Sequence, residues 1–349
     1  MQNDICEDII LTTLKDHPEK YQETISLIEK SFNYLADHKF DVDFYPLMNK
    51  KNHHHNYLLL SKVDESVVGH IGVNLRQFQS RGNSTMTGLV GGVVLREDFQ
   101  RKGIMNLFLK KVLSLHHNNV SLFLLWSDLD KFYKKFNFHQ AGGIIQTSQP
   151  NNNIFPPLDY HHKSQLSKTE LLQIKKIYNL SFNNFTTLKR GEKDWQNIFN
   201  ITSSKLYIKK NNENEISAYF FYEKGHDFKN IIHEFGSLKK DYLPNIKELA
   251  NYCLWLPESQ DLNYPTGTHF YGGLFKVGSS YLFSEFIHNW SQNKIAIIDI
   301  SPDFIIFNFS GSEYTMTHAN FLESIFGPNS IKEFKLLGLP LYISGLDSV

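Results

Sequence analysis

The chain has 349 residues, of which 41% are hydrophobic and 14% aromatic, so it can bury more than one packed core. Lysine plus arginine equals aspartate plus glutamate, at 36 each, and the formal net charge is zero. A neutral chain has no overall electrostatic attraction for nucleic acid or for an anionic membrane. We therefore expect no nucleic-acid partner and no membrane partner.

The chain's first residues, 1–16, contain no basic stretch followed by an apolar core, so they predict no signal peptide. No apolar run approaches the roughly 18 residues that a membrane span needs. Cys6 and Cys253 are far apart and stand in no metal-binding or redox spacing. These features predict a cytoplasmic protein with two reduced thiols.

The first 150 residues predict one domain of mixed helices and strands. Apolar side chains recur at helical spacing near the start and again after residue 103, and the runs between them read as strands. Leu89–Leu95 is almost entirely apolar, as in a central strand that is buried on both faces. In chain order we expect a helix at Tyr21–Leu35, strands at Tyr57–Val63, Val67–Phe78 and Leu89–Leu95, a helix from Ile104, and a strand at Leu122–Trp126.

A boundary is predicted at Gln146–Pro157, where three prolines and three consecutive asparagines break any regular element. Beyond it, Ser167 and Glu170 form a capping box at the start of a helix. The order strand, turn, strand, strand, helix then repeats that of the first domain and predicts a second domain at 158–265. Its expected elements are a helix to Phe182, strands at Lys205–Lys210, Ile216–Lys224 and Asn230–Gly236, and a helix at Tyr242–Leu256.

The pattern changes again near Thr266, so residues 266–349 are expected to form a small α+β region that docks on the second domain. The segment is short for an independent domain. Its expected elements are a helix at Tyr281–Trp290, paired strands at Lys294–Ile300 and Phe304–Phe309, and a short helix at Thr317–Phe326 that ends at Gly327.

The stretch from Gly88 to Phe138 carries the clearest chemical signal. An apolar strand runs into the basic turn Gln100–Met105, and a helix follows. The first backbone N–H groups of a helix have no internal partners, so this turn can seat a pyrophosphate. Tyr133 follows the next strand, where its hydroxyl could give a proton to a leaving group.

These residues resemble the GCN5-related N-acetyltransferase (GNAT) superfamily. Gln100, Gly103 and Met105 stand at the marked positions of its acyl-CoA loop, Q/R-x-x-G-x-G/A. Phe132, Tyr133 and Phe138 match its F-Y-x-x-x-G-F signature. Two residues depart from the pattern, Met105 in the loop and Asn137 in the signature. A long apolar residue in the loop also occurs in tandem acetyltransferases of the enhanced-intracellular-survival type.

The resemblance implies an α/β (α+β) fold class: tandem GNAT folds, each a mixed central sheet flanked by helices, plus the small α+β region. It implies an N-acetyltransferase with acetyl-CoA as co-substrate and no metal. The acceptor would be the primary amine of a small molecule or of a lysine side chain, attacking the thioester directly. Only the 1–150 domain would be catalytic, because Ser237–Pro244 lacks the Q/R-x-x-G spacing. The second, degenerate domain would form one wall of the active-site cleft and shape substrate access.

The resemblance also assigns residues to roles. Tyr133 would be the general acid, and Asp128 would help to bind the amine or would cap the next helix. In the enhanced-intracellular-survival type the terminal carboxylate enters the active site, so Val349 becomes a candidate base or anchor. The residues implied in cofactor binding are Val93, Val94 and Leu95 for the thioester and pantetheine, and Gln100, Arg101, Lys102, Gly103, Ile104 and Met105 for the pyrophosphate.

Several alternatives stay open. A non-catalytic acyl-CoA-binding or sensing module would fit the same turn, and Met105 and the unidentified base favour it. A tandem GNAT that transfers aminoacyl or long-chain acyl groups is a further alternative, and a homo-oligomer is possible. The run His53–His55 predicts a polar loop and not a metal site. His70 is expected to be structural, and Asp41 and Asp43 are expected in a solvated loop.

Overall fold

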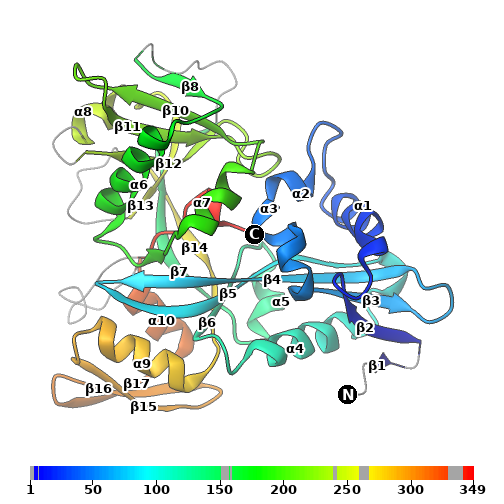
Figure 1. The fold of residues 1–349 in the computed structure, drawn as a ribbon. Helices are drawn as coiled ribbons and strands as arrows, with labels where there is room; N and C mark the ends of the chain where they lie inside the picture. The colour runs from blue at the N-terminus through cyan, green and yellow to red at the C-terminus, as the bar shows by residue number, and fades with distance from the viewer. Residues whose placement is uncertain are drawn as a thin grey trace.

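The structure is a computed structural model that describes residues 4–6, 8–150, 157, 159–238, 242–258, 267–328 and 341–349. Its main feature is one long sheet that runs through the whole chain, shown as arrows in Figure 1. The strands follow the order β1-β2-β3-β4-β5-β6-β14-β7-β13-β12-β11-β10-β8. The large mixed sheet with flanking helices confirms the predicted α/β fold class.

The amino-terminal half of the sheet is antiparallel from β1 to β5, and β6 runs parallel to β5. Helix α1 packs on one face and α4 on the other, and the alternating side chains of the strands divide between these two cores. The elements are β1 (Asp4–Cys6), β2 (Ile9–Thr13), α1 (Tyr21–Ser31), α2 (Phe40–Asp43), α3 (Tyr45–Met48), β3 (Asn56–Ser61), β4 (Val67–Ser80), β5 (Asn83–Leu95), α4 (Ile104–His116), β6 (Leu122–Leu125), α5 (Asp130–Lys134) and β7 (His139–Gln146).

The second half adds strands to the same sheet, because β13 pairs antiparallel with β7 and parallel with β12. The predicted capping box of Ser167 and Glu170 is confirmed at the start of α6. The elements are β8 (His161–Lys163), α6 (Lys168–Phe182), β9 (Thr187–Leu188), α7 (Glu192–Phe199), β10 (Lys205–Lys210), β11 (Ile216–Tyr222), β12 (Ile231–Ser237), α8 (Tyr242–Glu248) and β13 (Cys253–Pro257).

The helix expected at Tyr242–Leu256 is wrong in its second part. Helix α8 ends at Glu248, and Cys253–Pro257 forms β13. The apolar run there fills the gap between β12 and β7, where its backbone pairs on both sides. A short apolar run does not reveal by periodicity whether it is helix or strand, so the sheet decides. Part of the loop Ser237–Pro244, residues 239–241, lies outside the described residues.

The expected docking of residues 266–349 on the second domain is wrong for residues 268–326, although residues 341–349 do contact the second half. Strand β14 (Thr268–Val277) lies between β6 and β7 and pairs antiparallel with both. Consecutive strands β6 and β7 do not pair in the described structure, and β14 supplies the hydrogen bonds that their facing edges need. Helix α9 (Ser280–Trp290) packs on β5 and α10 (His318–Phe326) on β7, so the region covers the first half of the sheet.

A small sheet lies beneath these two helices in Figure 1 and contains three antiparallel strands. Buried Phe283, Trp290 and Phe321 join its core to Leu89 and Leu122 of the main sheet. The strands are β15 (Ile295–Ile300), β16 (Phe304–Phe309) and β17 (Ser312–Thr317). No helix within the described ranges is both long and apolar enough to cross a membrane.

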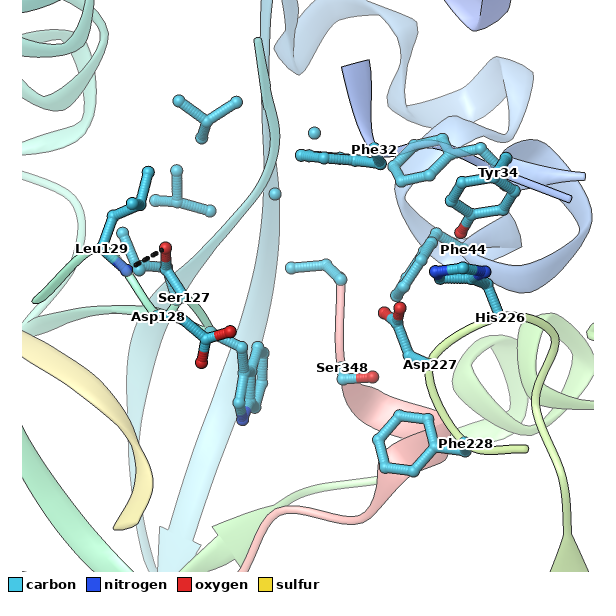
Figure 2. Close-up of a pocket in the computed structure, with 18 of the residues that line it drawn as sticks. Phe32, Tyr34, Phe44, Ser127, Asp128, Leu129, His226, Asp227, Phe228 and Ser348 are labelled. Carbon is cyan, nitrogen blue, oxygen red and sulfur yellow. Dashed lines mark hydrogen bonds between the residues drawn. The ribbon is translucent and has the colours of Figure 1, made fainter. Parts of the chain in front are cut away.

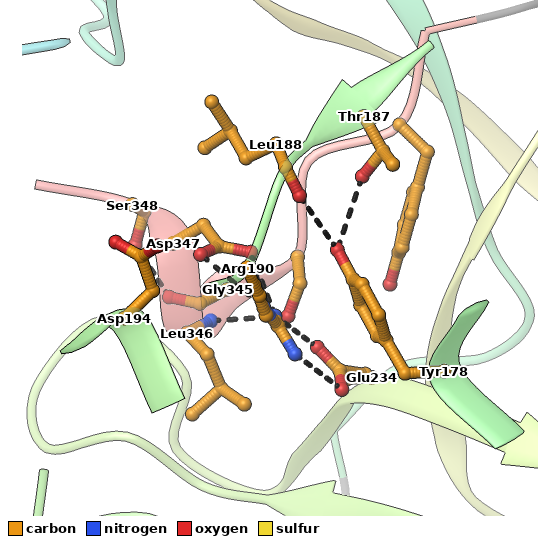
Figure 3. Close-up of polar contacts among 12 residues, drawn as sticks. Tyr178, Thr187, Leu188, Arg190, Asp194, Glu234, Gly345, Leu346, Asp347 and Ser348 are labelled. Atoms are coloured by element: carbon orange, nitrogen blue, oxygen red, sulfur yellow. Dashed lines mark hydrogen bonds and ion pairs between the residues drawn. The ribbon is translucent and has the colours of Figure 1, made fainter. Parts of the chain in front are cut away.

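Residues 341–349 return to the middle of the molecule and are held there by a buried ion network (Figure 3). Arg190 donates hydrogen bonds to Asp347 at 2.6 Å and to Glu234 at 2.9 Å. Arg76 of β4 reaches the other oxygen of Asp347 at 3.0 Å. Burial alone would raise the pKa of Asp347, but the two guanidinium groups lower it. The network therefore ties both halves of the sheet to the last residues described.

We expect Asp347→Ala to lower the free energy of unfolding by about 3–5 kcal/mol, because it leaves two buried guanidinium groups short of a partner. Urea unfolding followed by circular dichroism measures the loss. Glu192→Ala is the matched control, since Glu192 pairs with Lys175 while its side chain is 77% exposed, and such a pair contributes less than about 1 kcal/mol. Equal small losses in both variants would contradict a structural role for the network.

Candidate active site

Two cavities adjoin where β5 meets α5. The first, of about 550 Å³, lies against the turn before α4, and we call it the turn cavity. The second, of about 410 Å³, lies toward the second half of the chain, and we call it the inner cavity. Phe32, Val93, Leu129 and Tyr133 line both. A ligand that extends through the turn cavity therefore meets one held in the inner cavity beside Val93 and Tyr133.

The turn cavity is bounded by the residues of the predicted pyrophosphate seat, with the exception of Lys102. Gly103 has φ 77°, a left-handed conformation that glycine adopts without strain, and it caps α4 with no side-chain hydrogen bond. Among the described residues no side chain caps this end of α4, so its first N–H groups are available to a ligand. Gln100 donates to the Leu95 carbonyl at 2.8 Å, which fixes the turn to the end of β5. Met105 lines the cavity and also packs on the apolar core beneath α4.

Beside the cavities, the backbone of β5 is not paired with β6, because the two strands diverge. The two strands pair only from Thr87 to Leu89, so the β6-facing edge beyond Leu89 is unpaired in the described structure. The register with β4 also shifts near Gly92, which has φ 59°. His70 Nδ1 lies 2.7 Å from the Gly92 carbonyl and supports this irregularity. Burial lowers the pKa of His70 to about 4, and the ring does not line either cavity, so His70 is structural as expected.

Tyr133 stands at the junction of the two cavities. Its side chain is 5% exposed, and its ring packs edge-on against Phe132 and Phe138. The hydroxyl makes no hydrogen bond to any residue that the structure describes. Burial raises the pKa of Tyr133 to about 12, so the hydroxyl stays protonated and can donate a hydrogen bond at neutral pH.

The inner cavity has aromatic walls and an acidic rim (Figure 2). Asp128 lies on the wall after β6, and Asp227 lies across the cavity on the hairpin between β11 and β12. Val349 lines it too, and its backbone carbon packs so closely on Gly91 that a Cβ there would come within 2.5 Å. The aromatic lining residues are Phe32, Tyr34, Phe40, Phe44, Trp126, Tyr133, His226, Phe228 and Trp255.

Sequence analysis missed the contribution of the hairpin at 223–230 and misjudged Asp43. Asp43 is 1% exposed, not solvated, and accepts a hydrogen bond from the His226 backbone N–H at 3.3 Å. Gly225 is required there, because a Cβ at that position would clash with the Asp43 carboxylate. These residues lie far apart in sequence, so no local spacing signals their meeting. Asp41 instead accepts a hydrogen bond from the Tyr21 hydroxyl at 3.0 Å.

Lys224 of the same hairpin holds the last residues in place. Its buried ammonium group donates to the carbonyls of Gly345 at 2.8 Å and Ser348 at 3.0 Å, and to the Ser348 hydroxyl at 2.8 Å. Burial lowers the pKa of Lys224 to about 7, although Asp227, Asp43 and Asp347 act in the opposite direction. The position of Val349 in the inner cavity therefore depends on a residue from the second half of the chain.

Comparisons with known proteins identify a related domain and related folds. Residues 15–141 match the model of an acetyltransferase (GNAT) domain. The fold is similar to that of a GCN5-related N-acetyltransferase from Kribbella flavida, with 11% identity, a TM-score of 0.60 and 98% of each chain covered. It is also similar to Eis1 from Mycobacterium abscessus, with 12% identity, a TM-score of 0.57, and 95% of this chain and 92% of that one covered.

A more distant likeness is to the N-myristoyltransferase of Saccharomyces cerevisiae with bound myristoyl-CoA, with 10% identity and a TM-score of 0.54. It covers 79% of this chain and 80% of that one. No curated protein matched the chain. Residues 15–141 thus match a GNAT domain, in line with the resemblance seen in the sequence, and the fold of the chain is like that of these N-acetyltransferases.

We expect the contribution of Lys224 to stability to depend on pH. The pKa of Lys224 is about 7 in the folded state and 10.5 for a solvated lysine, so between these values the unfolded state keeps a proton that the folded state has lost. The free energy of unfolding then rises with pH across this window. Lys224→Met lacks that rise, so the stability difference between wild type and variant should grow from pH 7 to 10.5. Urea unfolding at several pH values measures it, and a flat difference would contradict the lowered pKa.

Proposed function

We propose that the chain transfers an acetyl group from acetyl-CoA to a primary amine, with direct attack of the amine on the thioester. The observation that carries the proposal is the junction of the two cavities beside Val93 and Tyr133. Acetyl-CoA would occupy the turn cavity with its thioester at the junction, and the amine would reach the same point from the inner cavity. Such an arrangement holds both reactants together, which converts a bimolecular step into an effectively unimolecular one.

The pyrophosphate would lie on the backbone N–H groups of Gln100–Met105, at the positive end of the α4 dipole. Exposed Arg101 and Lys102 add positive charge beside it. The thioester carbonyl would accept a hydrogen bond from a backbone N–H of Val94 or Leu95, where β5 leaves its pairing with β6. Such a donor stabilises the oxyanion that forms when the amine attacks.

Tyr133 would donate a hydrogen bond to the departing thiolate and then protonate it. With a pKa of about 12, the Tyr133 hydroxyl is a weak acid and keeps its proton at neutral pH. Its contribution is therefore largest where negative charge develops on sulfur, in the transition state. Asp128 and the carboxyl group of Val349 would bind the ammonium form of the amine or accept its proton. Both face the inner cavity.

We expect Gly103→Asp to weaken acetyl-CoA binding by at least about tenfold, because a carboxylate about 4 Å from a phosphate repels it by roughly 1–4 kcal/mol near a protein surface. Isothermal titration calorimetry measures the dissociation constant. Gly103 has φ 77°, so the substitution also strains the backbone.

Gly103→Asn is the matched control, since asparagine has the shape of aspartate, tolerates the left-handed region and carries no charge. It should retain most of the affinity. If both variants bind acetyl-CoA as tightly as the wild type, the pyrophosphate lies elsewhere.

We expect Tyr133→Phe to lower kcat by about 100- to 10,000-fold, the usual loss for one general acid. The ring and its contacts with Phe132 and Phe138 remain, so the melting temperature and the acetyl-CoA affinity should change little. A steady-state assay of thiol release over a panel of amines measures kcat and KM separately. The loss should fall on kcat, since the proton is needed in the transition state.

Two outcomes would contradict this assignment. A kcat within a factor of a few of wild type would leave Tyr133 as a packing residue only. Acetyl-CoA binding without turnover on any amine, in the wild type, would favour the alternative of a non-catalytic acyl-CoA-binding module.

A further inference from the structure

Strand β5 carries a bulge at the junction of the two cavities. On β4, Ile71 alone stands opposite two residues of β5, Gly92 and Val93, where the register of the two strands shifts. Gly92 has φ 59°, a left-handed conformation. Neither Gly92 nor Val93 has a strand partner in the described pairing with β4 or β6. Val93 lines both cavities, so the backbone groups of the bulge lie where the thioester is proposed to bind.

His70 of β4 holds this bulge from the interior of the protein. Its side chain is 0% exposed and packs against the bulge, since a Cβ on Gly92 would come within 2.9 Å of the ring. Nδ1 of His70 lies 2.7 Å from the Gly92 carbonyl oxygen. A carbonyl oxygen can only accept a hydrogen bond, so Nδ1 is the donor in this contact. The bond fixes the direction in which the Gly92 carbonyl points.

Asn56 holds the ring in turn. The Asn56 side chain is buried, and its Nδ2 donates to the carbonyls of Leu47 and Asn52, each at 2.9 Å. Its Oδ1 therefore faces Nε2 of His70, at 2.9 Å. Two acceptors favour a ring that is protonated on both nitrogens, whereas burial lowers the pKa of His70 to about 4. Both forms of the ring can donate from Nδ1 to Gly92, so the contact with the bulge does not depend on which form is present.

The contact with His70 also sets the direction of the next N–H group. A peptide unit is planar and trans, so the Val93 N–H points opposite to the Gly92 carbonyl. Because His70 lies on β4, we expect the Val93 N–H on the other side of β5, where β6 has diverged. A donor that is fixed before the reaction stabilises an oxyanion without the cost of being reoriented.

We infer that His70 is a positioning residue for acyl transfer, which holds the Gly92–Val93 peptide so that the Val93 N–H joins the strand donors to the thioester carbonyl. The ring lines neither cavity, so it acts through this peptide and touches no reactant. The inference rests on the proposed acetyl transfer and adds a residue that the proposal does not use. Removal of one oxyanion donor costs about 100- to 1,000-fold in kcat, which is the upper limit for a donor that is only misdirected.

Infrared spectroscopy of bound acetyl-CoA, labelled with carbon-13 at the acetyl carbonyl, tests the inference without an amine. Hydrogen bonds to the carbonyl lower its stretching frequency relative to free acetyl-CoA. His70→Leu removes the donor to Gly92, so the band should move back toward that of free acetyl-CoA, while the dissociation constant changes little. His70→Asn can place an amide N–H at the position of Nδ1 and should keep the band near that of the wild type. His70→Gln places its amide at the position of Nε2 and should not.

His318→Leu is the matched control for loss of a buried histidine. His318 is 3% exposed, and its Nε2 donates to the backbone carbonyl of Ser301 at 2.8 Å, but the ring lines neither cavity. The carbonyl band and kcat should stay near those of the wild type in this variant. In His70→Leu, kcat on any amine that the wild type acetylates should fall by about tenfold or more, with KM little changed.

An unchanged carbonyl band in His70→Leu overturns the inference, as does an equal loss of kcat in the two leucine variants. Melting temperatures show whether each variant is folded. If His70→Leu does not fold, the two amide variants decide, and equal bands in His70→Asn and His70→Gln overturn the inference. If the wild type binds acetyl-CoA but acetylates no amine, the proposed function fails separately. A shifted band in His70→Leu then still upholds the role of His70 at the thioester, and an unchanged band overturns it.

Discussion

The buried ion network around Arg190 is the constraint on which the rest of the site depends. A buried guanidinium group is costly unless carboxylates surround it. Arg190 has two such partners, Glu234 of β12 and Asp347 of the last residues, and Asp347 is shared with Arg76 of β4. The charges are balanced only when β4, β12 and the last residues have come together. The network therefore specifies one arrangement of the three, and that arrangement places Val349 against Gly91 in the inner cavity.

The sequence predicted most of the local structure that the acyl-CoA turn needs. The Q-x-x-G spacing, the apolar strand before it and the tyrosine after the next strand are all encoded within fifty residues, and local patterns report on local geometry. The predicted strand at Lys205–Lys210 and the capping box at Ser167 follow from the same kind of signal. In each of these cases the residues that determine the structure are neighbours in the chain.

The features that the sequence did not predict depend on contacts between distant segments. Cys253–Pro257 forms a strand because its backbone pairs with β12 on one side and β7 on the other. Its own residues do not predict this pairing. Asp43 is charged and ends the short helix α2, so it looks solvated, yet the hairpin at 223–230 covers it. The acidic wall formed by Asp227 has the same origin. The inner cavity is thus formed by segments that are far apart in the sequence, which local patterns do not predict. The turn cavity is lined mainly by residues that are close together in the sequence.

The insertion of β14 also constrains how the protein can be made. Strands β6 and β7 are complete by residue 146, but the strand that pairs with both of them ends at Val277. Synthesis proceeds from the amino terminus. After β7 is made, more than a hundred further residues must be added before β14 can complete the central sheet. Until then two hydrogen-bonding edges are open, and open edges invite pairing with other chains. The amino-terminal segment that carries the recognisable motifs is therefore not a self-sufficient folding unit.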